Sequence, residues 1–166
     1  CGVEKAGFEQ DDNAMDVAIR KDLMLHAYML TQSGIPMLYS SDEIGRLNDY
    51  SYKEDPDKAA DSRYIHRGAF QWELAGKRNS KSSVEAQIFQ TLSRMEQIRS
   101  QESVFDKDCD VYTYDVHDDS ILCILRQKGN ERFIGIFNFS DSKKTAWMQE
   151  EGTFRDLITD QTLELK

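Results

Sequence analysis

Charged and polar side chains gather directly after a short apolar run near the middle of the chain. The stretch GIPMLYSSDEIGRLNDY covers residues 34–50, and its polar half carries Asp42, Glu43, Arg46, Asn48 and Asp49. Two carboxylates facing one bond are the usual equipment for acid–base chemistry. Asp42 and Glu43 are adjacent, however, and neighbouring residues of an extended chain point in opposite directions. We therefore interpret them as groups that fix the loop through hydrogen bonds and ion pairs, and we predict no catalytic residue here.

Metal and cofactor sites are not indicated by the sequence. The acidic stretch EDPDKAAD at residues 54–61 lacks the glycine and the final glutamate of an EF-hand loop. The three cysteines, Cys1, Cys109 and Cys123, lie far apart and show no zinc spacing. We predict no metal and no cofactor. An odd number of free thiols favours a reducing compartment, so we expect a cytoplasmic protein.

The composition is that of a soluble globular chain. Its 166 residues are 39% hydrophobic and 31% charged, with a net charge of −9. Such a charge repels phosphate backbones, which argues against nucleic acid as a partner. No apolar run approaches the roughly 20 residues of a membrane span, so no membrane partner is predicted. The N-terminus has no secretory signal and no initiator methionine, so we expect further residues to precede Cys1.

A helix and a strand must position the polar loop. We predict the helix over residues 14–33, with capping oxygens before it and Gly34 and Pro36 at its end. Its second half, LMLHAYML, is apolar on nearly every side, which indicates burial from several directions. Residues 35–39 are a continuous apolar run, which predicts a strand covered on both faces.

The rest of the chain divides into a long loop, a second helix and a β-rich tail. Residues 40–81 are polar but hold several aromatic residues, so we expect an ordered functional loop. A second helix is predicted over residues 83–100, with Ser82 and Glu85 as a capping box. It has one apolar stripe at helical spacing, formed by Val84, Ile88, Leu92, Met95 and Ile98. After residue 104 the period changes to two, which predicts a small antiparallel β-sandwich. Its expected strands are VYTYDV, ILCILRQ, RFIGIFNF, TAWMQ, FRDLIT and TLEL.

These motifs resemble the C-terminal part of the alpha-amylase superfamily of glycoside hydrolases, and within it the amylosucrase branch. Residues 34–50 are similar to the superfamily's last barrel strand and following loop, G-x-P-x-x-Y-x-G-[DE]-E-[IVL]-G, which amylosucrases continue with L-N-D. DSRYIHR at 61–67 is similar to D-S-R-W-x-H-R, and IFNFSD at 136–141 to a strand of the C-terminal domain. CGVEKAGFEQDD resembles the end of an inserted subdomain. Ser41 replaces the usual glycine, and Tyr64 the usual tryptophan.

The resemblance implies an α+β fragment of a larger enzyme. Residues 1–103 would be the last βα part of a (β/α)8 barrel, and residues 104–166 a C-terminal β-sandwich. The catalytic Asp, Glu and Asp of the superfamily follow earlier barrel strands, which this chain lacks. We therefore expect it to be inactive alone, while the whole enzyme would act on α-glucosides, transferring glucosyl units from sucrose. Alpha-amylase, oligo-glucosidase, sucrose phosphorylase and trehalose synthase activities are alternatives, as is a non-catalytic carbohydrate-binding or structural module.

The same resemblance implies three substrate-binding candidates. Arg63 would line the floor of the sugar pocket, where an arginine held by a carboxylate presents fixed donors to sugar hydroxyls. Asp61 is expected to orient Arg63, and His66 to touch substrate. Without the rest of the barrel, the strand at 35–39 and the apolar helix before it would be left open, so we also expect self-association through residues 14–40.

Overall fold

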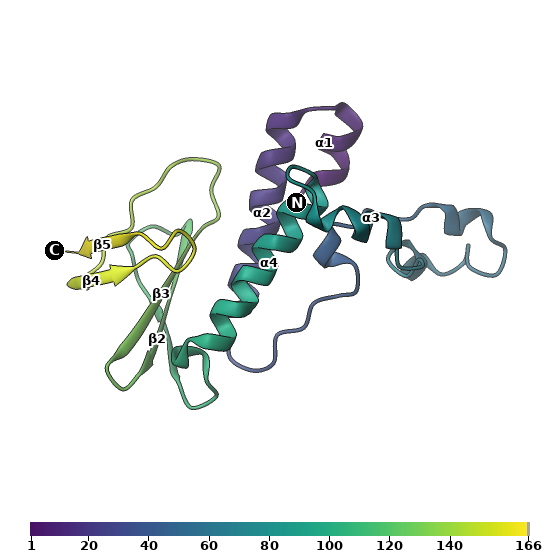
Figure 1. Ribbon diagram of the computed structural model, residues 1–166. Coiled ribbons are helices and arrows are strands. Elements are labelled where there is room, and N and C mark those ends of the chain that lie inside the picture. Colours follow the sequence, from purple (N-terminus) through teal and green to yellow (C-terminus); the bar gives the residue numbers. More distant parts are fainter. Residues whose placement is uncertain (166) are drawn as a thin grey trace. The chain divides into compact units, whose positions relative to one another are not determined.

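The computed structural model describes residues 1–165, and these form a mixed α+β fold (Figure 1). The described helices are α1 (Val3–Glu9), α2 (Asp12–Thr31), α3 (Trp72–Gly76) and α4 (Val84–Gln101). The described strands are β1 (Asp110–Tyr114), β2 (Ile121–Lys128), β3 (Glu131–Asn138), β4 (Gly152–Arg155) and β5 (Thr162–Leu165). Every strand pairing is antiparallel, and residues 1–165 contain no barrel. None of these helices is both long and apolar enough to cross a membrane.

The chain divides into two compact units whose boundaries fall inside α2 and α4. The first unit comprises Cys1–Leu23 and Met37–Leu92, and the second begins with Met24–Pro36 and continues from Ser93. The sequence predicted a single boundary, between residues 103 and 104, where the predicted barrel region ends and the predicted sandwich begins. The second unit is larger than the predicted sandwich because the last turns of both helices pack with the strands: Tyr28 of α2 meets Phe137 of β3 edge to face at 5.7 Å.

The core of the first unit lies between the first half of α2 and the first half of α4. Ile19, Ile88 and Leu92 are almost fully buried there. Partly buried side chains of α1, α2 and α4 surround them, namely Val3, Met15, Leu23 and Val84. The apolar stripe predicted for the second helix is thus the stripe that α4 buries.

The predicted first helix has different bounds in the structure. It begins at Asp12 and ends at Thr31, and a separate helix, α1, precedes it. Asp11 caps α2 by accepting a hydrogen bond from the backbone N–H of Ala14 at 2.9 Å. The helix ends before Gly34, whose φ of 93° is a left-handed conformation that glycine adopts without strain.

The predicted strand at residues 35–39 is not formed, and this prediction is wrong for the described chain. The segment is extended without regular pairing, and Ile35 and Met37 are 91% and 81% exposed. A strand is defined by the ladder of a neighbour, and no neighbouring strand is present within residues 1–165 to accept these backbone groups. The apolar side chains of this segment are therefore largely exposed and not packed on both faces as predicted.

The residue that caps α4 is Ser83, not the predicted Ser82. The Oγ of Ser83 accepts a hydrogen bond from the backbone N–H of Ala86 at 3.1 Å, which satisfies one free donor of the first turn. The helix itself, Val84–Gln101, lies within one residue of the predicted range.

Replacing the cap should test this assignment. We expect Ser83→Ala to lower the free energy of unfolding by about 1 kcal/mol, because the first turn of α4 loses its side-chain acceptor. Ser82→Ala is the matched control, since Ser82 is exposed one residue earlier and should change stability by less than about 0.5 kcal/mol. Urea unfolding followed by circular dichroism measures both, and equal losses would contradict the assignment.

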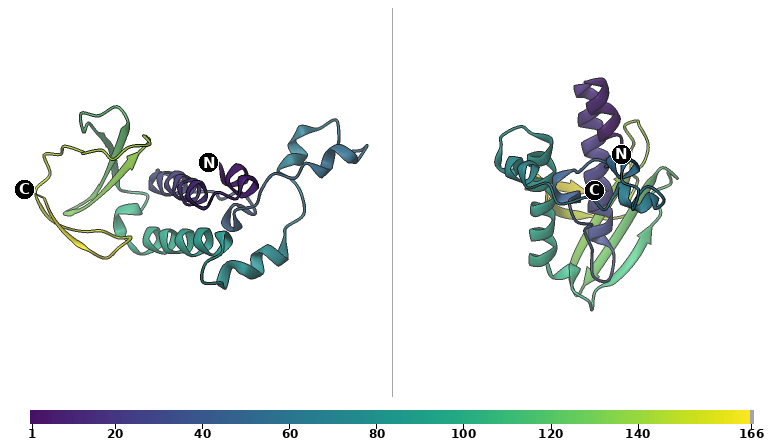
Figure 2. Two further views of the ribbon diagram at one scale, coloured as in Figure 1. Left: turned by 90° about the horizontal axis from the view of Figure 1, so that it is seen from above. Right: turned by 90° about the vertical axis from the view of Figure 1, so that its right-hand side faces the viewer.

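The strands of the second unit follow the predicted order with one exception. β1, β2 and β3 form one sheet, and β4 and β5 form a separate hairpin, drawn yellow in Figure 2. The expected strand TAWMQ at residues 145–149 is not formed. There, the backbone N–H of Gln149 donates to the hydroxyl of Tyr114 at 2.7 Å instead of joining a ladder. The tail is therefore a three-stranded sheet with an added hairpin.

Two arginines of the second unit, Arg126 and Arg99, donate hydrogen bonds to backbone carbonyls at the end of α2. Arg126 of β2 is 1% exposed and donates to the backbone oxygens of Val104 (2.7 Å) and Thr31 (2.9 Å). Arg99 of α4 donates to the carbonyls of Leu30, Gln32 and Gly34 around the end of α2. The last carbonyls of a helix have no partners within the helix and attract cations, so both guanidinium groups tie the end of α2 to the sheet and to α4.

Candidate functional site

A pocket of about 370 Å³ lies in the first unit. Its walls come from two stretches of the loop between α2 and α4, residues 39–48 and residues 63–67. The lining residues are Tyr39, Ser40, Asp42, Arg46, Leu47, Asn48, Arg63, Ile65, His66 and Arg67. These are the same two stretches that carry the sequence motifs described above. Two of the three predicted substrate-binding residues, Arg63 and His66, therefore share one pocket.

Backbone and side-chain contacts join the two stretches. The backbone N–H of Asp49 donates to the carbonyl of Ile65 at 2.9 Å. Nη1 of Arg46 donates to the carbonyl of Gly68 at 2.7 Å. The side chain of Arg46 is only 7% exposed and contributes to the pocket wall. Arg46 is thus both a structural tie between the stretches and a positive charge at the site.

The backbone of Gly68 lies directly against the side chains of Arg46 and Asp49. A Cβ atom at residue 68 would lie 1.8 Å from Nη2 of Arg46 and 2.8 Å from a carboxylate oxygen of Asp49. Because both contacts are far shorter than van der Waals separation, any larger residue would push the Arg46 guanidinium out of its place.

We expect Gly68→Ala to lower the free energy of unfolding by roughly 1–3 kcal/mol, since it breaks the charged hydrogen bond between Arg46 and the backbone. Gly76→Ala is the control, because nothing lies within 4 Å of a Cβ there and Gly76 ends the helix α3. The control should leave stability unchanged or raise it slightly. Thermal unfolding compares the variants, and a Gly68→Ala protein as stable as Gly76→Ala would show that Arg46 is not fixed as described.

Asp61 and Arg63 form the tightest charged pair of the site. Oδ1 of Asp61 accepts from Nε of Arg63 at 2.8 Å, and Oδ2 accepts from Nη2 at 2.7 Å. Asp61 also caps the turn η3 (Ser62–Ile65) by accepting from the backbone N–H of Arg63 at 3.0 Å. These hydrogen bonds from Arg63 lower the pKa of Asp61 to about 2. The carboxylate therefore stays ionised at neutral and mildly acidic pH, and its bonds to Nε and Nη2 fix the orientation of the Arg63 guanidinium.

His66 and Arg67 complete this side of the pocket. The backbone carbonyl of His66 accepts a hydrogen bond from the hydroxyl of Tyr39 at 3.4 Å, which links it to the opposite wall. The side chains of both residues are exposed. Asp61 is absent from the pocket wall, so it acts on the site through Arg63.

Three neighbouring residues of the first stretch, Ser41, Asp42 and Glu43, have different structural roles. Ser41 is buried with a φ of 83°, a left-handed conformation that favours glycine, the residue of the family pattern. Oε2 of Glu43 accepts the backbone N–H of Ser41 at 2.8 Å, so Glu43 fixes the loop as predicted. Asp42 lines the pocket.

Sequence reasoning gave no role to Arg46. The residue was visible among the charged residues of residues 34–50, but nothing in its neighbourhood signals a partner 22 residues away. The one available signal was Gly68 directly after DSRYIHR, since a glycine next to a motif often marks close approach of another group.

Trp72, Phe70 and the acidic stretch at residues 54–61 lie outside the pocket wall. Trp72 is 79% exposed and meets Phe70 with ring centroids 4.7 Å apart. In the acidic stretch, Asp55 forms an ion pair with Lys58 at 2.6 Å. Within residues 1–165, no group of three or more His, Cys, Asp or Glu side chains is placed to hold a metal ion.

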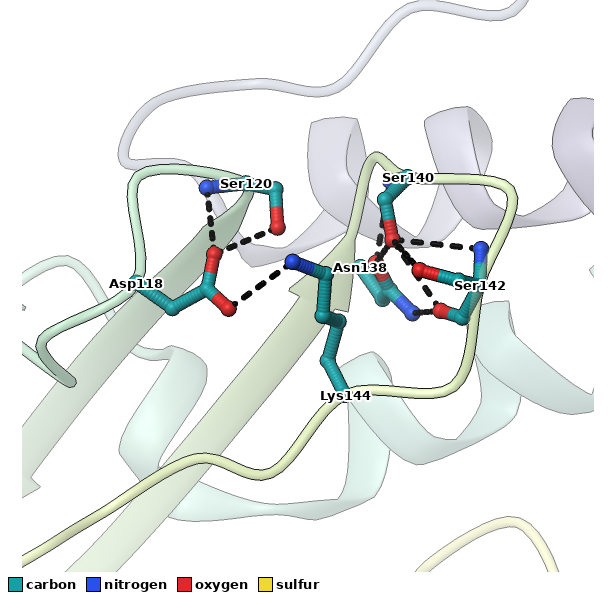
Figure 3. Close-up of polar contacts among 6 residues, drawn as sticks. All are labelled: Asp118, Ser120, Asn138, Ser140, Ser142 and Lys144. Carbon is teal, nitrogen blue, oxygen red and sulfur yellow. Dashed lines mark hydrogen bonds and ion pairs between the residues drawn. The ribbon is translucent and has the colours of Figure 1, made fainter.

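A second polar cluster lies in the second unit and includes part of the IFNFSD stretch (Figure 3). Oδ1 of Asn138 accepts from the backbone N–H and the hydroxyl of Ser140, and Nδ2 of Asn138 donates to the carbonyl of Ser142. Asp118 accepts from Ser120 and, at 3.1 Å, from Lys144; the bonds from Ser120 are the main reason why its pKa falls to about 2. The bonds to Asn138 and from Ser120 are local to the turns that follow β3 and β1, and the bond from Lys144 to Asp118 joins those two turns, so the cluster holds the turns together.

No protein-family model matches the chain. The chemistry of the site is therefore inferred from its lining residues alone. Two loop stretches of the first unit form a pocket whose wall contains three arginines, one histidine and one aspartate.

Proposed function

We propose that the chain is the C-terminal part of an amylosucrase-like member of the alpha-amylase superfamily, and that it supplies one wall of the sugar pocket. The observation that carries the proposal is the convergence of the two motif stretches. Residues 34–50 and 61–67 resemble the same family independently, and their side chains line one pocket.

Arg63 has the geometry that a sugar-binding arginine needs. Asp61 occupies Nε and Nη2, so the guanidinium is held by two parallel bonds. Nη1 makes no hydrogen bond to any residue between 1 and 165, and the side chain is 69% exposed. A fixed, accessible donor of this kind can bind a hydroxyl of a glucosyl unit with little further loss of side-chain conformational entropy.

The pocket wall does not contain the chemistry of glycoside hydrolysis. Retaining enzymes place two carboxyl groups about 5–5.5 Å apart across the bond that breaks. Asp42 is the one carboxylate in the wall of this pocket, as residues 1–165 define it. The chain thus contributes binding, and the catalytic carboxylates would come from the preceding barrel segments of the full-length protein.

Turnover assays test the proposal. The full-length protein that contains this chain should release fructose from sucrose and transfer the glucosyl unit, and should leave maltose largely unhydrolysed. The chain of 166 residues alone should do neither. Maltose or starch hydrolysis without sucrose turnover would replace the amylosucrase-like reading by an amylase-like one. Glucan binding by the isolated chain, with no sugar turnover by the full-length protein, would favour the non-catalytic module.

We also propose that the isolated chain associates with itself. Apolar side chains are left open along its first forty residues: Ile35 is 91% exposed, Met37 81% and Leu25 44%. Unpaired extended backbone next to apolar side chains invites pairing with another chain. Light scattering on a dilution series should give a mass above 19.2 kDa that falls on dilution. A constant monomer mass would exclude self-association.

A further inference from the structure

We propose that the pocket contains a subsite for a phosphoryl group, formed by Arg46, Arg63 and Arg67. The inference goes beyond the proposed function, which concerns an uncharged glucoside, and it stands on the charges of the pocket alone. Its ligand would be inorganic phosphate or a phosphate monoester of a sugar. Both present the same tetrahedral oxyanion, which suits several guanidinium groups better than a planar carboxylate, whose two oxygens one arginine fork can occupy.

Arg46 provides the buried charge of this subsite. Its side chain is 7% exposed, and burial of a cation is costly unless the charge is paired and its donors are bonded. Its ion-pair partner, the carboxylate of Asp49, lies 3.8 Å from Nη2, beyond hydrogen-bond length. Nε is buried and has no acceptor among the described residues. The positive charge is therefore incompletely compensated by the protein and acts on the pocket that Arg46 lines.

Arg67 and Arg63 provide the accessible donors. Arg67 is exposed at the pocket, and its guanidinium makes no hydrogen bond or ion pair with any residue between 1 and 165. Arg63 keeps Nη1 available while Asp61 fixes its orientation. Arg46, Arg63 and Arg67 line the same pocket, so an oxyanion bound there has one buried and two accessible guanidinium groups in its wall, and His66 in the same wall adds an imidazole donor.

The local charge differs in sign from that of the whole chain. The wall of the pocket carries three arginines against one carboxylate, Asp42, whereas the chain has a net charge of −9. Charges in solution are screened over about 8 Å at physiological ionic strength, so an anion in the pocket is governed by its near neighbours. Asp49 and Asp61 reduce the positive charge through their ion pairs with Arg46 and Arg63; Arg67 forms no ion pair within residues 1–165, although its charge also contributes to lowering the pKa of Asp61.

Titration of the 166-residue chain followed by two-dimensional NMR tests the subsite. The probes are inorganic phosphate, glucose 1-phosphate, glucose and acetate. We expect saturable shifts of backbone amides at residues 46–49 and 63–68 with both phosphates, weakening as salt is added, and no saturable shifts with glucose or acetate at the same concentrations. Tighter binding of glucose 1-phosphate than of phosphate would identify the ligand as a sugar phosphate, and weaker binding of glucose 1-phosphate would identify inorganic phosphate; equal binding would show that the subsite recognises the phosphoryl group alone.

Substitutions separate the pocket from general electrostatics. Arg67→Gln should weaken phosphate binding about tenfold, the effect of one lost contact of about 1.4 kcal/mol. Arg67→Lys should lose less, because it keeps the charge but not the fork. Arg20→Gln removes the same charge from an exposed position on α2 and should leave binding unchanged. The proposal is overturned by absence of saturable phosphate shifts, by equal shifts with acetate, or by equal losses in Arg67→Gln and Arg20→Gln. None of these results bears on sucrose turnover by the full-length protein.

Discussion

Replacing Arg126 by alanine is expected to lower the free energy of unfolding by about 3–5 kcal/mol. The side chain is almost fully buried, and its two hydrogen bonds satisfy the carbonyls of Val104 and Thr31. Its guanidinium also lies over the ring of Phe105, 5.3 Å from the centroid. Truncation would leave two carbonyls without donors and a cavity beneath the sheet. Since small domains are stable by only about 5–15 kcal/mol, a substantial part of the chain's stability depends on this residue.

Arg155→Ala is the matched control for this prediction. Arg155 forms a surface ion pair with Glu102 at 2.8 Å, and its side chain is 57% exposed. Exposed pairs contribute at most about 1 kcal/mol, so the control should cost little. Chemical unfolding in urea, followed by circular dichroism, compares the two variants. If Arg126→Ala costs no more than Arg155→Ala, the buried arginine does not tie α2 to the sheet in the way described.

Arg63→Lys in the full-length protein is expected to lower kcat/KM for sucrose by about 100-fold or more. The two bonds from Asp61 require a planar fork, and a lysine ammonium can replace neither the parallel geometry nor the free Nη1 donor. A misplaced binding group also disturbs the alignment of the reacting bond, so kcat should fall as well as affinity.

Arg20→Lys provides the comparison for Arg63→Lys, because it makes the same chemical change at an exposed site on α2, outside the pocket. Steady-state kinetics with sucrose measure both variants. Equal kcat/KM values for the two would make Arg63 an ordinary residue of a surface loop, even if the full-length protein does turn over sucrose.

Local signals in the sequence predicted most of the secondary structure. The apolar stripe gave α4 to within one residue, and the turn residues between short alternating runs located β2 and β3. The failures have a common cause. Residues 35–39 and 145–149 have the composition of strands, but a strand forms only against a neighbour, and pairing over long distances is not encoded in the run itself. The sequence alone could not tell which of the adjacent serines, Ser82 or Ser83, caps α4, because the choice depends on which hydroxyl reaches the backbone N–H of Ala86.

The candidate site was predictable to the extent that its contacts are local. Asp61 and Arg63 lie two residues apart, so a charged pair between them is a natural expectation. The tie between Arg46 and Gly68 spans 22 residues and depends on the close approach of two loop stretches. Arg126 is a still harder case, because nothing in the alternating pattern of β2 distinguishes an arginine that faces the core from one that faces solvent.

Amide hydrogen exchange of the full-length protein, with and without sucrose, tests most directly whether the pocket is a sugar-binding wall. A ligand that binds the pocket should slow exchange in both loop stretches together, residues 39–48 and residues 61–68, because each contributes to the same wall. The turns that follow β1 and β3 in the second unit should be unaffected. Slower exchange in both stretches is the predicted result. Sucrose turnover with unchanged exchange in both stretches would contradict the account, because the substrate would then bind elsewhere.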